Sequence, residues 1–217
     1  MTTLPSFFFN MIVFLLILNL IFLSSDSIPT GEGKFKILPE SRVYLEGTTN
    51  VNKFKCDCGN NFGSNTYHLR NIEGNKMEFS NTLLSLPIEF FDCKNRKMDR
   101  DLQKALKADQ FPAVRIELEN ITLAQGHLTS IETGNWTHAK AMVNISLAGV
   151  TRQHVIPVKA KKGMLHQFHF TGHQSMKMTD FKVTPPEALF GMIKANDPIT
   201  FYFDLVLTLE QHPGPIQ

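Results

Sequence analysis

Residues 199–210 read ITFYFDLVLTLE, and this stretch decides the fold class of the chain. Apolar side chains occupy its odd-numbered positions, Ile199, Phe201, Phe203, Leu205, Leu207 and Leu209. The even-numbered positions are mostly polar, and only Val206 breaks the alternation. A period of two is typical of a β-strand with one face in the core and the other face toward water. We therefore predict that this stretch is a strand of an antiparallel sheet.

The same alternation recurs upstream of this strand. Further strands are predicted at 42–58, 76–86, 114–118, 143–147, 152–161 and 164–177. Within 42–58 the apolar positions change from odd (Val43, Leu45) to even (Phe54), which we interpret as a β-bulge near Asn50. At least seven strands without alternating helices predict an all-β fold, a single antiparallel barrel or sandwich.

One segment of the mature chain, DRDLQKALKA at 99–108, has the pattern of a helix. Asp99 belongs to the residue types that cap helix N-termini, and Leu102 and Leu106 lie four apart on one face. Pro112 prevents the helix from continuing. We predict one short helix with Asp99 as its N-cap.

Length and charge limit the number of domains and the kinds of partner. A domain has roughly 150 residues, so 217 residues are expected to form one core. The net charge is only +2 and the basic residues are scattered, which does not indicate nucleic-acid binding. We expect a barrel domain at 42–211, preceded by a lead-in at 28–41 with a short strand near 35–38, and followed by a tail at 212–217.

The first 27 residues have the pattern of a secretory signal. Phe7 to Leu23 is almost continuously apolar, and the small residues Ser25 and Ser27 follow with the spacing of a signal-peptidase site. We predict cleavage after Ser27 and a periplasmic or secreted protein. The alternative is an uncleaved membrane anchor, because no Lys or Arg precedes the apolar run.

Three cysteines, Cys56, Cys58 and Cys93, agree with export. Cys56 and Cys58 are two apart on a predicted strand and share a face, so either could reach Cys93. A disulfide from Cys93 to one of them is the leading interpretation. Three free buried thiols and a metal site are the alternatives, although the metal site lacks a convincing fourth ligand.

No catalytic or metal motif stands out. His166, His169 and His173 lie in one strand region, but residues three apart on a strand point to opposite faces. Neither a Gly-x-Ser-x-Gly elbow nor a glycine-rich phosphate loop occurs. We therefore expect no catalytic residues, no metal and no enzymatic activity.

Four segments in order form a recognisable pattern. They are VYLEGTTNVNKF at 43–54, MDRDLQKALKADQFPAVRIEL at 98–118, MVNISLAGVTRQHVIPV at 142–158, and 176–207 with Thr179-Asp180-Phe181 before the final strand. Through the order and spacing of these segments, the chain resembles the YceI-like family of lipocalin-like, polyisoprenoid-binding proteins of bacterial envelopes. Asn144 and Ser146 depart from the Gly and Thr that many members carry in the third segment, so the resemblance does not name the ligand.

The resemblance implies an elongated eight-stranded antiparallel barrel that holds an isoprenoid-type chain. We expect a quinone or polyprenyl lipid to lie against residues that parity turns inward, Val143, Ile145, Phe168, Phe170, Phe201, Phe203 and Leu205. Gly172 shares the parity of Phe168 and Phe170, so a larger residue there is expected to block the lipid. No other cofactor is expected, and the membrane serves only as the source of lipid or through an uncleaved signal. The oligomeric state stays open.

Two other functions remain open at this point. One is a structural or stress-related envelope protein with a filled core and no ligand. The other is an enzyme with an unrecognised site. An apolar tunnel inside the barrel favours lipid binding, solid packing favours the structural role, and converging polar groups favour the enzyme.

Overall fold

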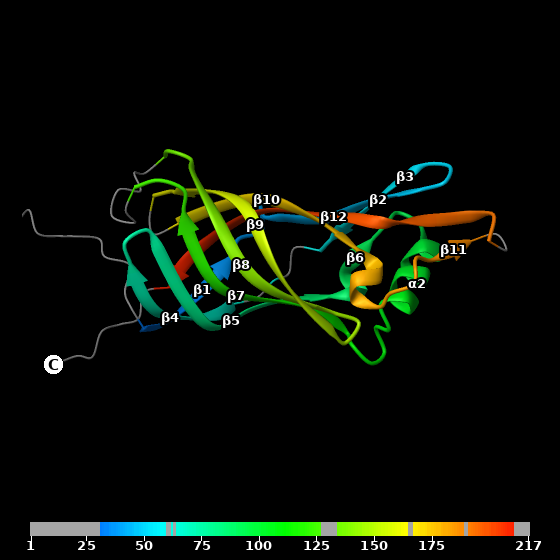
Figure 1. Cartoon of the computed structure of the whole chain (residues 1–217), viewed down its shortest axis with the longest axis horizontal. Coiled ribbons are helices and arrows are strands. Elements are labelled where there is room, and N and C mark those ends of the chain that lie inside the picture. The colour runs from blue at the N-terminus through cyan, green and yellow to red at the C-terminus, as the bar shows by residue number, and fades with distance from the viewer. Residues whose placement is uncertain are drawn as a thin grey trace, which may run out of the picture.

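The computed structural model describes residues 31–59, 62, 64–126, 134–164, 167–188 and 191–210. The expected signal at 1–27 and tail at 212–217 therefore lie outside the described residues. Figure 1 shows one elongated molecule in which long, twisted strands wrap around a common axis. The prediction of an all-β antiparallel fold is confirmed.

Strands make up most of the described chain. In order the elements are β1 Gly31–Ile37, β2 Arg42–Thr49, β3 Lys53–Cys58, β4 Ser64–Glu73, β5 Lys76–Pro87, the 3₁₀ turn η1 Ile88–Phe90, β6 Phe91–Asp92, the helix α2 Arg96–Ala105, β7 Ala113–Leu123, β8 Thr137–Leu147, β9 Val150–Lys162, β10 Gln167–Lys177, the 3₁₀ turn η3 Met178–Phe181, β11 Glu187–Ala188 and β12 Ile193–Glu210. Every pairing between these strands is antiparallel.

Eight strands close into a ring in the order β1-β4-β5-β7-β8-β9-β10-β12, because β12 pairs with β1 as well as with β10. The ring is possible because β12 is 18 residues long and has two neighbours along one edge. Its first part pairs with β2, and its last part pairs with β1. Strands β2, β3 and β6 extend the wall at the end of the molecule that carries α2 (Figure 1).

The interpretation of 42–58 as one bulged strand is wrong. β2 and β3 are separate strands that pair as a hairpin, from Val43 opposite Cys58 to Thr48 opposite Lys53. The Thr49 hydroxyl accepts hydrogen bonds from the backbone N–H groups of Val51 and Asn52 and so closes the turn. A turn between two strands can shift the inward-facing residues from odd to even positions, as a bulge does. The sequence pattern therefore did not distinguish the two.

Two strands of the ring differ from the sequence-based prediction, because β1 is longer than predicted and β4 was not predicted. β1 spans the whole of Gly31–Ile37, so the region expected as a lead-in forms part of the wall. β4 was not predicted at all, although Tyr67 and Leu69 are its two buried side chains and alternate as strand residues do. The strands expected at 76–86, 114–118, 143–147, 152–161 and 164–177 are present as β5, β7, β8, β9 and β10.

The helix begins earlier than predicted. α2 starts at Arg96 with Asn95 as its N-cap, whose side-chain oxygen accepts from the N–H groups of Lys97 and Met98. Asp99 instead accepts a hydrogen bond from the backbone N–H of Cys93 at 2.8 Å. Among the described residues α2 is the only α-helix, and no helix there is both long enough and apolar enough to cross a membrane.

Candidate functional site

The strand ring encloses an apolar cavity with a volume of about 610 Å³. This volume lies within the range of roughly 300–1,000 Å³ that is usual for small-molecule sites. Side chains from every strand of the ring line it, together with residues of β2, β3 and α2. The interior of the barrel therefore keeps unfilled apolar space, which we call the tunnel.

All seven residues predicted to face the ligand do line the cavity: Val143, Ile145, Phe168, Phe170, Phe201, Phe203 and Leu205. They differ in how closely they are packed. Val143 and Ile145 are each 5% exposed, whereas the other five keep intermediate exposure. Contact with a ligand stays a prediction for all seven, but the latter five have surface that no protein atom covers.

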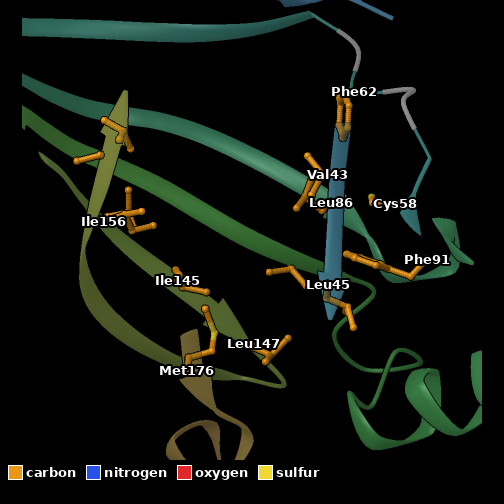
Figure 2. Packing of buried hydrophobic residues seen from close by; sticks show 14 of the residues in the cluster. Val43, Leu45, Cys58, Phe62, Leu86, Phe91, Ile145, Leu147, Ile156 and Met176 are labelled. Atoms are coloured by element: carbon orange, nitrogen blue, oxygen red, sulfur yellow. The ribbon is translucent and has the colours of Figure 1, made fainter. Parts of the chain in front are cut away.

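We call the inner face of β8 and β9 the packed wall. Its members are small or branched and buried: Ala139, Ala141, Val143, Ile145, Leu147, Ile156, Val158 and Ala160. Figure 2 shows Ile145, Leu147 and Ile156 gathered from these two strands beside Met176 of β10. The hairpin that carries this wall is paired along the whole of β8, from Thr137 to Leu147.

We call the inner face of β10 and β12 the open wall. Its members are larger and only partly buried: Phe168, Phe170, Phe201, Phe203, Leu205, Leu207 and Leu209. β10 pairs with β12 over its full length but with β9 only from Phe168 to Gly172. The two walls therefore separate toward the α2 end, and the turn η3 contacts β9, β10 and β12 there.

Gly172 faces inward as predicted, but it is a poor place for a blocking side chain. It pairs across the ladder with Phe203, and a Cβ at position 172 would lie 2.7 Å from the Phe203 ring and 2.8 Å from the carbonyl oxygen of Pro157. A ring could turn away, but the backbone of β9 would have to move. A loss of binding in Gly172→Leu would therefore not separate a blocked tunnel from a distorted wall.

α2 covers one end of the cavity. Met98, Leu102 and Leu106 contribute to the lining from this segment, as the spacing of the two leucines indicated. The helix is held near the wall through its first turn, where Asp99 binds the Cys93 N–H. Its opposite side is polar, because Arg96, Lys97, Arg100 and Lys104 are exposed.

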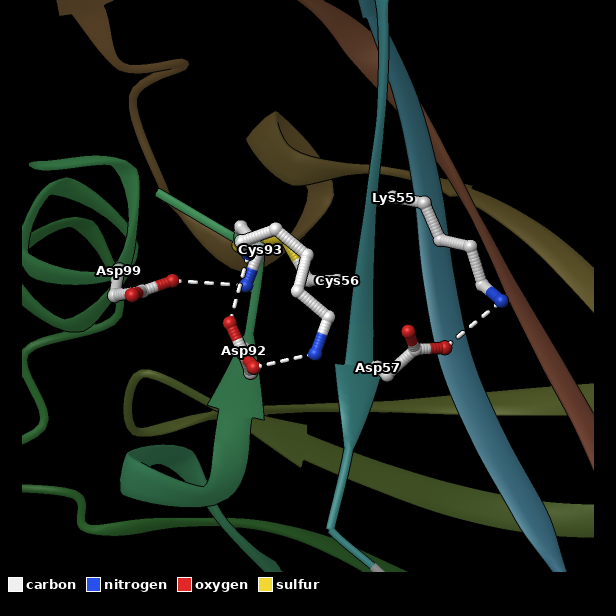
Figure 3. A network of polar contacts seen from close by, with 7 residues as sticks. Lys55, Cys56, Asp57, Asp92, Cys93 and Asp99 are labelled. Atoms are coloured by element: carbon white, nitrogen blue, oxygen red, sulfur yellow. Dashed lines mark hydrogen bonds and ion pairs between the residues drawn. A yellow bond between two sulfur atoms is a disulfide. The ribbon is translucent and has the colours of Figure 1, made fainter. Parts of the chain in front are cut away.

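A disulfide between Cys56 and Cys93 joins β3 to the segment that leads into α2 (Figure 3). β3 and β6 share only two paired positions, so this is a short ladder in the wall. Cys58 is left as a buried thiol, and burial raises its pKa to about 11. Such a thiol is protonated at neutral pH and therefore a weak nucleophile.

Polar residues of the lining gather at the ends of the cavity. Around α2 they are Thr49, Asn52, Asn95, Lys97, Asp101 and Glu187, and at the other end they are Lys161 and Lys162. In between, the Thr82 hydroxyl is already bonded to Ser80 and His68, and the Gln174 amide donates to the Ser175 carbonyl. The middle of the tunnel is thus suited to a hydrocarbon chain.

The histidines do not form a metal site in the described part of the chain, where no three His, Cys, Asp or Glu side chains converge. His169 bonds to Asp204, His173 stacks on Tyr202, and His166 lies outside the described residues. His154 was not singled out from the sequence. It stacks on the fully buried Phe181, and burial lowers its pKa while Asp180 opposes that shift.

Comparison with known proteins agrees with this architecture. The model of the YceI-like domain matches residues 44–207, which is most of the chain. The chain belongs to the YceI-like family. No curated protein sequence matches it.

Two solved structures share the YceI-like fold of this chain. One is a polyisoprenoid binding domain from Saccharophagus degradans implicated in plant cell wall breakdown, with a TM-score of 0.58 and 7% identity over 81% of this chain and 98% of that one. The other is BcnA of Burkholderia cenocepacia, with a TM-score of 0.55 and 15% identity over 79% of this chain and 99% of that one. At such identities the likeness shows the fold alone.

Proposed function

We propose that this YceI-like protein is an exported lipid-binding protein that holds the apolar chain of a quinone or polyprenyl lipid in its tunnel. The observation that carries the proposal is the cavity of about 610 Å³, whose open wall keeps large apolar side chains partly uncovered. Exposed apolar surface inside a protein is costly unless a ligand covers it. The polyisoprenoid-binding relative supports the same class of ligand.

The shape and polarity of the lining favour a long chain over a compact polar molecule. Its polar groups lie at the two ends, and those in the middle have hydrogen-bond partners. Each methylene that leaves water contributes about 0.8 kcal/mol before ordering costs. A tail of several isoprene units can therefore bind tightly without a charged contact.

Export belongs to the proposal. The apolar run Phe7 to Leu23 and the small residues before Ile28 support a cleaved signal, and the Cys56–Cys93 disulfide suits an oxidising compartment such as the periplasm or the exterior. The intact mass of the exported protein should correspond to a chain that starts at Ile28. A mature form that keeps Met1 would support the membrane anchor instead.

Binding without catalysis is the role that we infer. The described interior offers apolar surface and no converging set of acids, bases or nucleophiles around a reacting position. The rival role is a structural envelope protein with a filled core. The cavity does not favour it, since side chains leave the tunnel unfilled.

Native mass spectrometry of protein purified from its own envelope tests the proposal. We expect a lipid adduct, and we expect added quinones or polyprenols to raise the melting temperature. Leu205→Trp should fill the tunnel and abolish the adduct. Val206→Trp is the matched control, because Val206 is the next residue of β12, points to the outer face and does not line the cavity. The proposal fails if the purified protein carries no lipid and neither kind of added lipid binds.

A further inference from the structure

Both ends of the tunnel present exposed apolar residues, Trp136 and Met164 where β9 meets β10, and Val51 and Met192 at the α2 end. At the α2 end, two described stretches project beyond the barrel: Asn50–Asn52 between β2 and β3, and Gly191–Met192 directly before β12 (Figure 1). Val51 at the first turn is 63% exposed, and Met192 at the second is 67% exposed. Apolar side chains that point into water at the tip of a fold are candidates for contact with an apolar partner.

The two turns are fixed to each other. The Asn50 side chain donates to the Met192 carbonyl at 2.9 Å and accepts from the Lys194 N–H at 2.9 Å, and the Asn50 N–H donates to the Lys194 carbonyl at 3.1 Å. The turns that carry Val51 and Met192 are therefore joined in one preformed tip, which we call the paired tip.

The paired tip stands at the rim of the tunnel. The residues that flank Val51 and Met192, Asn52 and Ile193, line the cavity, as do Met98 and Leu102 of α2. A lipid that leaves a membrane at this end would pass from one apolar surface to the next. The rim thus connects the exposed apolar residues with the binding site.

The charge beside the paired tip favours an anionic partner. Between Lys94 and Lys107 there are six exposed cations and two carboxylates, and one of the cations, Lys94, is ion-paired with Asp92. The apolar side of α2 lines the cavity, so its exposed basic side is the part that an anionic bilayer attracts.

We propose that the α2 end, with the paired tip and the basic side of α2, docks on an anionic lipid bilayer to load and unload the tunnel. The proposal rests on the proposed lipid-binding function and names the partner from which the lipid is taken. The opposite end, where β9 meets β10, faces away from the bilayer. The two ends are far apart, because β12 with its 18 residues runs between them and spans roughly 55 Å.

Sedimentation with lipid vesicles tests the docking directly. Protein stripped of lipid is mixed with vesicles of phosphatidylglycerol and phosphatidylethanolamine, or of phosphatidylcholine alone. We expect binding to the anionic vesicles that weakens as salt is added. Val51→Asp combined with Met192→Asp should weaken it about tenfold or more, since burial of such side chains is lost. Arg96→Glu with Arg100→Glu should weaken it on anionic vesicles only.

Matched controls come from exposed positions elsewhere. Met164→Asp alters an even more exposed methionine, 78% exposed, at the opposite end, and Lys159→Glu alters an exposed cation on the outer face of β9. Both should bind vesicles as the parent does. The docking proposal is overturned if the paired-tip variant binds as well as the parent, if Met164→Asp binds as poorly, or if no vesicle is bound.

A second readout keeps this result separate from the proposed function. In the paired-tip variant, the transfer of a fluorescent polyprenol from donor vesicles should slow, while the amount bound at equilibrium from detergent should match the parent. Tip-dependent vesicle binding by a protein that takes up no polyprenol or quinone would leave the docking standing and overturn the lipid-carrier function. Uptake without tip-dependent docking would do the reverse.

Discussion

Apolar residues alternate in the same way along the packed wall and the open wall, but the two walls differ in how far their inward side chains are buried. On β8 and β9 the inward side chains are buried against other side chains. The open-wall side chains of β10 and β12 are equally apolar but keep intermediate exposure, whereas Met176 of β10 is buried. Alternation therefore tells which residues point inward, whereas the space across the barrel decides whether an inward residue serves stability or binding.

The largest expected effect concerns the disulfide that ties the region between the open wall and α2. Cys93→Ser opens a loop with a sequence separation of 37, which corresponds to about 4 kcal/mol in the chain-entropy model. Denaturant unfolding measures this loss. Cys58→Ala is the control, since Cys58 is free and buried. A loss as large in the control would show that packing, and not the cross-link, stabilises this region.

The next effect tests the packed wall. Ile145→Ala should destabilise the fold by roughly 3 kcal/mol, because removal of a fully buried side chain leaves a void that neighbours fill only partly. Ile145 is 5% exposed, so most of this cost should already appear in the lipid-free protein. A loss below 1 kcal/mol, measured by chemical unfolding of the lipid-free protein, would contradict the assignment of Ile145 to a packed region.

Leu205→Ala is the matching change on the open wall. Leu205 already has partial exposure to the tunnel, so we expect roughly 1 kcal/mol of lost stability in the lipid-free protein. Its affinity for a polyprenyl lipid should fall about tenfold, since lipid contacts are removed. Titration with lipid and unfolding without lipid separate the two quantities. The comparison of the walls breaks down if Leu205→Ala and Ile145→Ala have the same ratio of stability loss to affinity loss.

The smallest effect concerns pH at the margin of the packed wall, where His154 pairs with Val143. Burial lowers the pKa of His154 below its ordinary 6.5 in the folded chain. The unfolded chain then binds the proton more readily than the folded chain. The contribution of His154 to the free energy of unfolding is therefore fully present above pH 6.5 and is lost as the pH falls toward the lowered pKa. His154→Gln should flatten this slope in unfolding experiments at a series of pH values. An unchanged slope would assign the dependence to other groups.

Much of the fold was predictable because its strands alternate strictly. β8 and β12 show their inward faces in the sequence, and all seven residues chosen by parity line the tunnel. β4 was missed because its core contribution is limited to Tyr67 and Leu69 among polar residues with low strand preference, such as Asn65 and Asn71.

Other features depend on partners that a sequence does not show. Asn95 and Asp99 are both good capping residues, and the hydrogen bond from Cys93 to Asp99 decides between them. The hairpin at Asn50 and a bulge produce the same change of parity, so only the pairing of β2 with β3 distinguishes them. The tunnel is a property of the whole ring, because its space is what the inward side chains of all eight strands leave unfilled.

Three glycines in the wall have a consequence for the calibre of the tunnel. Gly33, Gly47 and Gly172 each pair across the ladder with an aromatic residue, Tyr67, Phe54 and Phe203 respectively. A Cβ on any of these glycines would come within 2.7 Å of the facing ring, so each ring lies flat against its neighbouring strand. These three glycines therefore help to set the inner width of the tunnel. A larger residue at any of them would push the facing aromatic ring toward the axis of the barrel. The tunnel would then admit only a thinner chain.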